Sequence, residues 1–273
     1  MGLEAVWRGE VVAIATMHGK EQVIGPLLAA AWGLRAIVPA GLNTDVLGTF
    51  TRDVARPGDA LATARLKAEA ALALTGGAIA VASEGSFGPH PDLPWAAVNR
   101  ELVVLIDRQR GIELVGEALS WETNYRQTQV RTWEEAQAFA AAVGFPDHGL
   151  VVGEAKGVRD RETLAQAVQA GLAQSGILWL ETDMRAMHNP SRMQVIAQAT
   201  QDLVAKGRSL CPVCGWPGFA ITERWPGLPC ALCGLPTPLV RSQRWVCRHC
   251  GYQQEEPVAE TVADPAYCPL CNP

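Results

Sequence analysis

Eight cysteines constrain this chain more strongly than any other feature of its 273 residues. All of them lie beyond residue 210, in four pairs with one spacing, Cys-x-x-Cys. The pairs are Cys211/Cys214, Cys230/Cys233, Cys247/Cys250 and Cys268/Cys271. Zinc takes four ligands at tetrahedral corners, and each Cys-x-x-Cys turn, here called a knuckle, supplies two thiolates. Two knuckles close one site, so the sequence predicts a small zinc-ribbon module over residues 207–273 with two structural Zn²⁺ ions.

The spacing between knuckles bears on which of them share a metal ion. Fifteen residues separate Cys214 from Cys230 and 17 separate Cys250 from Cys268, and both spacings are known for four-cysteine sites. Sequential pairing, first knuckle with second and third with fourth, is therefore favoured. Interleaved pairing, first with third and second with fourth, has compatible ligands and stays open. His249, inside the third knuckle, is not expected to be a ligand.

The residue after each knuckle is also informative. Gly215, Gly234 and Gly251 follow the first three knuckles, and Asn272 follows the fourth. The chain commonly turns there through a positive φ, which glycine adopts freely and asparagine tolerates.

Composition and charge indicate a globular protein of a reducing compartment. The chain is 48% hydrophobic and 19% charged, which is sufficient for a sizeable core. No apolar run reaches the roughly 20 residues of a membrane helix, and the first residues carry Glu4, Arg8 and Glu10 instead of a secretory pattern. We expect a cytoplasmic protein without membrane contact whose thiols bind metal; disulfides in a secreted module are the alternative.

The predicted zinc module has two possible roles. It could dock to a protein or a nucleic acid, or it could be a structural clip that replaces a core too small to hold itself. Its five arginines are balanced by five acidic residues, and the whole chain has a net charge of −5, so general attraction to nucleic acid is not favoured. One basic and aromatic cluster suits phosphate contact and stacking: Arg241, Arg244, Trp245, Arg248 and His249. Trp216, Trp225 and Trp245 are equally consistent with packing inside the module.

Alternating strand and helix patterns before the cysteines predict a mixed-sheet α/β domain with flanking helices over residues 1–206. In its first half we expect strands at 10–16, 35–38 and 78–83, helices at 21–32 and 59–74, and a loop at 39–51. Glycines and prolines at 84–91 should end the third strand.

The second half of this domain begins with a predicted hairpin, 102–107 paired with 112–118. Thr132 and Glu135 form a capping-box pattern, which predicts a helix at 133–143. Further elements are a helix at 161–174, a last strand at 177–182, and a helix that Pro190 opens and that reaches about Lys206.

Charged side chains come directly after three of the predicted buried strands. His18, Glu84 and Asp183 take these positions, and the carboxyl ends of strands line the ligand crevice of an α/β sheet. Lys20, Arg185 and Arg192 would neutralise phosphate there. Glu84 and Asp183 would hold Mg²⁺, with Asp45 as a third acid. The sequence thus predicts one pocket for a nucleoside phosphate.

Three segments occur in an order that resembles the inosine-triphosphate pyrophosphatase superfamily. They are ATMHGKE at 15–21, ATARLKA at 62–68 followed by AVASEGS at 80–86, and NPSR at 189–192. The resemblance implies a phosphate loop with His18 and Lys20, and a helix contributing Lys67. It also implies that Glu84 assists Mg²⁺ binding or water activation, and that Ser191 and Arg192 contact the base. Ser83 stands where that superfamily carries a second acid.

The whole chain also resembles an uncharacterised bacterial family in which such a domain precedes paired zinc knuckles. Two functions follow as hypotheses. One is a Mg²⁺-dependent hydrolase of the nucleoside-triphosphate pyrophosphatase type, with Lys20, Glu84 and Asp183 as catalytic residues. The other is a non-enzymatic sensor or adaptor, in which the α/β domain binds the ligand and the zinc ribbons dock to a protein or nucleic acid.

Overall fold

The computed structural model describes residues 2–44, 46, 58–90 and 93–273. Within it the chain forms two compact units. One unit is Trp7–Val204, and the other is Ala205–Pro273 together with Met1–Val6. The short helix α1 (Leu3–Trp7) has its last residue in the larger unit.

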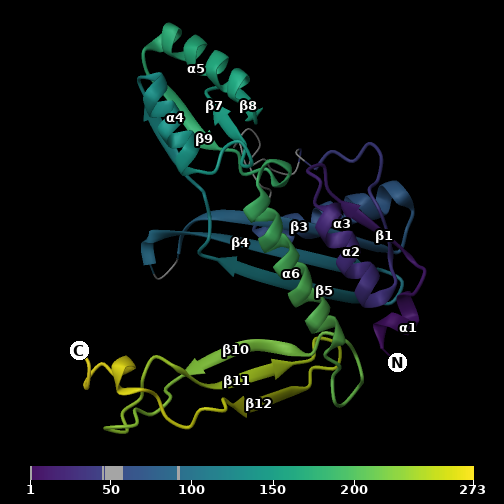
Figure 1. Cartoon of the computed structure of the whole chain (residues 1–273). Helices are drawn as coiled ribbons and strands as arrows, with labels where there is room; N and C mark the ends of the chain where they lie inside the picture. Colours follow the sequence, from purple (N-terminus) through teal and green to yellow (C-terminus); the bar gives the residue numbers. More distant parts are fainter. Residues whose placement is uncertain (1, 45, 47–57, 91–92) are drawn as a thin grey trace. The chain divides into compact units, whose positions relative to one another are not determined.

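The larger unit contains a five-stranded mixed sheet in the order β2-β1-β3-β4-β5 (Figure 1). The strands are β1 (Val11–Ala15), β2 (Arg35–Ile37), β3 (Ile79–His90), β4 (Leu93–Asp107) and β5 (Ile112–Ser120). Strand β1 pairs in parallel with both of its neighbours, whereas β3, β4 and β5 form antiparallel pairs. The predicted hairpin and the mixed sheet are confirmed.

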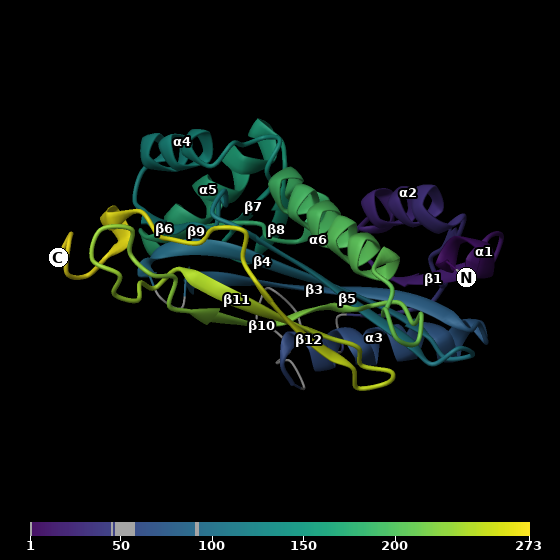
Figure 2. The ribbon, with the colours of Figure 1, turned by 90° about the horizontal axis from the view of Figure 1, so that it is seen from below.

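Helices cover both faces of this sheet. Helix α3 (Ala60–Thr75) packs its alanines on Ala13, Ala15 and neighbouring strand residues. Helix α2 (Glu21–Trp32) lies on the other face, where Gly25 approaches Ile14. Helix α6 (Pro190–Arg208) shares that second face, because its backbone at Ala199 and Leu203 leaves no room for a side chain at Gly116 of β5. Figure 2 shows α3 on one side of the long strands and α2 and α6 on the other.

A second sheet in the same unit has four strands in the order β6-β9-β7-β8, all antiparallel. They are β6 (Gln127–Val130), β7 (Leu150–Val152), β8 (Ala155–Val158) and β9 (Leu178–Thr182). Helices α4 (Trp133–Ala142) and α5 (Arg161–Ser175) pack on it around a core of its own. As the capping pattern predicted, the Thr132 hydroxyl accepts a hydrogen bond from the Glu135 amide at 3.2 Å and caps α4.

Two strand predictions need correction. The segment 84–91 does not end the third strand, because β3 pairs with β4 as far as His90, with a register shift between Pro89 and His90, so Glu84 lies within a strand. The strand at 177–182 is present as β9, but it belongs to the second sheet. Asp183 therefore follows a strand of the second sheet, whereas Lys20 follows β1 of the five-stranded sheet.

The smaller unit is built on a three-stranded antiparallel meander, β10-β11-β12. Its strands are β10 (Ala220–Pro226), β11 (Val240–Val246) and β12 (Gln253–Pro257), and a short 3-10 helix, η3 (Pro265–Tyr267), follows them. The knuckles lie before, between and after these strands. Among the described residues, no helix combines the length and the apolar character needed to cross a membrane.

Candidate functional site

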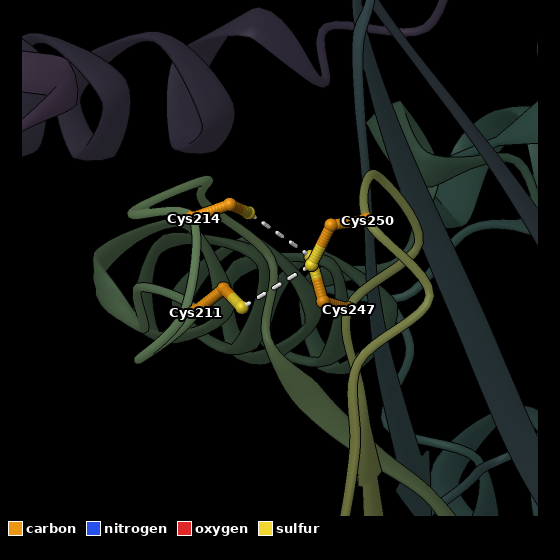
Figure 3. A group of neighbouring side chains, drawn as sticks. All are labelled: Cys211, Cys214, Cys247 and Cys250. Atoms are coloured by element: carbon orange, nitrogen blue, oxygen red, sulfur yellow. Dashed lines mark hydrogen bonds between the residues drawn. The ribbon is translucent and has the colours of Figure 1, made fainter.

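The first four-cysteine site joins the knuckle before β10 to the knuckle after β11. Cys211, Cys214, Cys247 and Cys250 place their sulfur atoms within 4.8 Å of one another, and the two pairs face each other in Figure 3. The Sγ atoms of Cys211 and Cys250 are 3.7 Å apart, as are those of Cys214 and Cys247.

The second site joins the knuckle after β10 to the knuckle after β12. It consists of Cys230, Cys233, Cys268 and Cys271. The Sγ distance is 3.9 Å between Cys230 and Cys271 and 3.6 Å between Cys233 and Cys268. With Zn–S bonds of about 2.3 Å, the sulfur atoms of a tetrahedral site lie about 3.8 Å apart. Both sites therefore fit an ion such as Zn²⁺.

The interleaved pairing corrects the favoured sequential one, and its cause is the antiparallel meander. A knuckle before β10 and a knuckle after β11 lie at the same end of the sheet, because neighbouring strands run in opposite directions. The knuckles after β10 and after β12 meet at the opposite end for the same reason. Knuckles that are adjacent in sequence are thus separated by the length of a strand.

The turns after the knuckles have the expected geometry. Gly215, Gly234 and Gly251 have φ values of 69°, 74° and 75°. Each donates its amide to the carbonyl of the first cysteine of its knuckle, at 2.8 or 2.9 Å. Asn272 makes the same bond to Cys268 at 2.9 Å. The turns close without strain, so each knuckle presents two thiolates to one point.

Aromatic side chains around the first site pack within the module. Phe219 contacts Cys211 and Cys247, with Trp216, Trp245 and Tyr252 against this cluster. The Trp216 and His249 rings stack with their centroids 4.0 Å apart. Arg244 lies over Trp225 at 4.5 Å and pairs with Glu223 at 3.4 Å. Trp245 and Arg244 of the predicted phosphate-contacting cluster therefore have partners within the module.

The carboxyl end of β1 is the second candidate site. The chain passes from β1 to β2 on one side and then to β3 on the other, with α2 and α3 on opposite faces. At such a switch in strand order, α/β proteins commonly bind ligands beyond the carboxyl ends of the strands. The loop Thr16–Lys20 occupies this position, and α2 begins directly after it.

Lys20 is the last residue of this loop. Its ammonium group is buried and donates to the backbone carbonyl of Ser83 at 3.2 Å and to the Ser83 hydroxyl at 2.9 Å. Both acceptors are uncharged. Burial, followed by the positive charge of Arg192, lowers the pKa of Lys20 to about 7. Glu101 and Glu84 oppose this shift and Lys67 adds to it. The pKa of Lys20 therefore depends on four other buried charges.

These four charges form two ion pairs, one on each face of the five-stranded sheet. Glu84 points to the α3 face and pairs with Lys67. Ser83 and Gly85 point to the opposite face, since side chains alternate along a strand. There Arg192, in the first turn of α6, donates to the Glu101 carboxylate of β4 at 2.7 Å. All four side chains are buried.

Arg192 is held by further contacts. Its guanidinium donates to the Met184 carbonyl at 2.5 Å and lies 5.4 Å from the centroid of the Phe87 ring. Its backbone amide donates to the side chain of Asn189 at 2.9 Å, which fixes the start of α6. A side chain at Gly85 would overlap the Glu101 carboxylate, so glycine there makes room for this ion pair.

The remaining predicted site residues have contacts of their own. Asp183 and Arg185 form a two-pronged ion pair with a shortest distance of 2.6 Å. The Ser191 hydroxyl is 2.8 Å from Nε2 of His148. The His18 amide donates to the Thr16 hydroxyl at 3.1 Å. Asp45 lies outside the described residues. Convergence of all the predicted residues on one ligand therefore stays a prediction.

Sequence reasoning missed three members of this region: Ser83 as the partner of Lys20, Glu101 as the partner of Arg192, and His148 beside Ser191. Glu101 had one usable signal, since it is a carboxylate next to the apolar run Leu102–Ile106. A charge within such a strand needs a buried partner. His148 had no comparable signal.

Comparison with known protein families gives a match over most of the chain. Residues 67–273 match the family described as "Domain of unknown function (DUF6671)", which is most of the chain. The chain belongs to the DUF6671 family. The DUF6671 match includes both four-cysteine sites and the charged residues Lys67, Glu84, Glu101 and Arg192. The resemblance to an uncharacterised family with paired knuckles is thereby confirmed. No curated protein matches the chain.

Proposed function

We propose that this DUF6671 protein binds a nucleoside phosphate at the carboxyl end of β1, and that its two four-cysteine sites hold structural Zn²⁺. The α/β unit supplies the ligand site. The zinc ions replace the hydrophobic core that a module of this size cannot build.

The buried Lys20 ammonium group is the observation that carries the phosphate proposal. The buried charges that shift the pKa of Lys20 are two cations, Lys67 and Arg192, and two carboxylates, Glu84 and Glu101, so this group with Lys20 has one cation in excess. The two carboxylates already pair with Lys67 and Arg192, whereas Lys20 bonds to uncharged oxygens. A buried cation is costly without a counter-charge. A bound anion would supply that charge.

The start of α2 favours the same ligand chemistry. Lys20 is the N-cap of this 12-residue helix, and no side chain caps it among the described residues. The amides of a helix N-terminus bear partial positive charge and bind phosphate oxygens. Gly19, with a φ of 72°, lets the preceding loop turn directly into this helix.

The nucleoside part of the proposal rests on the resemblance to the inosine-triphosphate pyrophosphatase superfamily. A base could lie near Ser191 and Arg192, as that resemblance implies. Hydrolysis with Mg²⁺ would require Glu84 or Asp183 to exchange its present cation partner for the metal. Binding needs no such exchange, and we therefore propose binding, with hydrolysis as an outcome to be tested.

The test measures thermal stabilisation of the zinc-loaded protein by ATP, GTP, ITP and XTP, with and without Mg²⁺, together with pyrophosphate release. We expect stabilisation by at least one nucleotide, lost in Lys20→Met and kept in the exposed control Lys156→Met. Stabilisation without release selects the sensor function, and Mg²⁺-dependent release selects the hydrolase. Absence of both effects with every nucleotide would refute the proposal.

A further inference from the structure

The knuckles of the second metal site expose large apolar side chains. Leu232 and Leu270 occupy the third position of their knuckles and are 75% and 64% exposed. Leu235, just after one knuckle, and Tyr267, just before the other, are exposed as well. The four sulfur atoms of the site lie within 4.8 Å, so these four residues surround one metal position. We call them the second-site surface.

Knuckle geometry explains the exposure of these residues but not their apolar character. Because the first and fourth residues turn their thiolates toward the metal, the two residues between them point outward. The third knuckle carries His249 at the position of Leu232 and Leu270, so a polar side chain is compatible with the turn. Apolar residues in both knuckles of the second site therefore need another reason. Exposed apolar clusters of this kind mark interaction surfaces.

Charge distinguishes the two ends of the module. Residues 205–219 and 246–252, around the first site, contain Lys206, Arg208 and Arg248 and no acidic residue. Residues 227–239 and 258–273, around the second site, contain Glu260 and Asp264 and no lysine or arginine. Both acidic residues are exposed. The second-site surface is thus apolar with an acidic margin.

From this combination we infer that the second-site surface binds a protein segment in which an apolar side chain lies beside lysine or arginine. The apolar side chain would be buried against Leu232 and Leu270, which would supply most of the affinity, since few central residues dominate an interface. Glu260 and Asp264 at the margin would select basic partners and speed association. Nucleic acid does not fit, because its phosphates would meet two carboxylates. The inference is independent of the phosphate site.

The experiment selects ligands for the zinc-loaded full-length protein from a random-peptide phage library. Synthetic versions of the enriched peptides are then titrated by fluorescence anisotropy. We expect peptides that combine an aromatic or aliphatic residue with lysine or arginine. Their affinity should fall about 10-fold or more in Leu232→Ser and in Leu270→Ser, and about two- to fivefold in Glu260→Gln.

Val213→Ser is the matched control, because Val213 holds the same knuckle position at the first site and is 66% exposed. It should change the affinity less than about twofold. Elemental analysis should give two zinc ions per chain in every variant, since none of these residues is a ligand. The inference fails if no peptide is enriched, if the peptides are acidic, or if binding ignores Leu232 and Leu270. A concentration-dependent dimer in sedimentation that Leu232→Ser abolishes would assign the surface to a second copy of the chain and would also overturn it.

Discussion

The sulfur atoms of Cys214 and Cys247 lie 3.7 Å apart although 33 positions separate the two residues in sequence. One strand and one further knuckle, Cys230/Cys233, lie between the end of the first knuckle and β11. The first site thus spans β10 and β11, and the second spans β11 and β12. Since β11 connects the two sites, loss of either metal should loosen the shared sheet.

Counting zinc in paired variants tests this connectivity. Cys214→Ser together with Cys250→Ser removes two ligands from one site, so the protein should keep about one zinc per chain. Cys214→Ser together with Cys233→Ser removes one ligand from each site. A three-ligand site releases its metal easily, and this second variant should therefore lose both ions. Elemental analysis of the purified proteins measures the difference.

Sequential pairing would give the reverse result, because Cys214 and Cys233 would then share a metal. Cys214→Ser alone is the control and should retain one zinc under either pairing. Fewer than one zinc per chain in the unmodified protein would contradict the assignment of both sites.

The interleaved pairing of the knuckles can be predicted from the sequence. The segments between knuckles, such as 220–226 and 240–246, carry alternating or β-branched patterns long enough for one strand each. If each segment is a strand of a meander, successive knuckles must alternate between its two ends. Ligand spacing alone ignores this constraint, and it therefore favoured sequential pairing. Local sequence patterns are sufficient to predict the number of metal sites, the mixed sheet, and the helix starts at Thr132 and Asp59. These predictions are confirmed.

The extent of β3 could not be predicted from local signals. Gly85, Gly88 and Pro89 are typical of a turn, yet β3 continues through them beside β4. Gly85 is required by a partner 16 positions away, because only a missing side chain leaves space for the Glu101 carboxylate. That requirement comes from tertiary packing. The sequence-based expectation that Glu84 follows the end of a strand is accordingly wrong, because Glu84 is a buried residue within β3.

Removing the Glu84 carboxylate should destabilise the fold. Glu84→Gln leaves Lys67 buried without its anionic partner, and breaking a buried ion pair in this way costs about 3 kcal/mol. The free energy of unfolding, measured by urea titration with tryptophan fluorescence, should fall by this amount.

The double variant Lys67→Met with Glu84→Leu is the control for charge burial. It removes both charges and keeps the side-chain volume, so much of the lost stability should return. If Glu84→Gln unfolds at the same urea concentration as the unmodified protein, the Lys67–Glu84 pair is not buried as described.

Two glycines of β3 should respond differently to a methyl group. In Gly85→Ala the new Cβ overlaps the Glu101 carboxylate and disturbs its pairing with Arg192, which should cost about 2 kcal/mol. In Gly88→Ala the Cβ meets no described atom, and the stability should change by less than about 0.5 kcal/mol. Thermal unfolding compares the two; equal losses would show that strand continuity, not the ion pair, sets the requirement at Gly85.

The protonation of Lys20 should control anion affinity. Its pKa is lowered to about 7, mainly by burial and then by Arg192, so in the free protein the ammonium group loses its proton as the pH rises above neutrality. A bound phosphate stabilises the charged form and raises this pKa. Binding therefore takes up a proton, and the affinity should fall between about pH 7 and pH 9, by at most about 10-fold per pH unit.

Isothermal titration calorimetry with pyrophosphate across this range, in two buffers of different ionisation enthalpy, measures both the affinity and the proton uptake. Lys20→Arg keeps its charge throughout, since arginine stays protonated in proteins, and its affinity should vary much less with pH. Lys20→Met should bind weakly at every pH. Pyrophosphate gains negative charge as the pH rises through this range, which strengthens its attraction to a cation, so ionisation of the ligand cannot itself produce the decline. An affinity of the unmodified protein that is flat from about pH 7 to pH 9 would exclude Lys20 as the phosphate-binding cation.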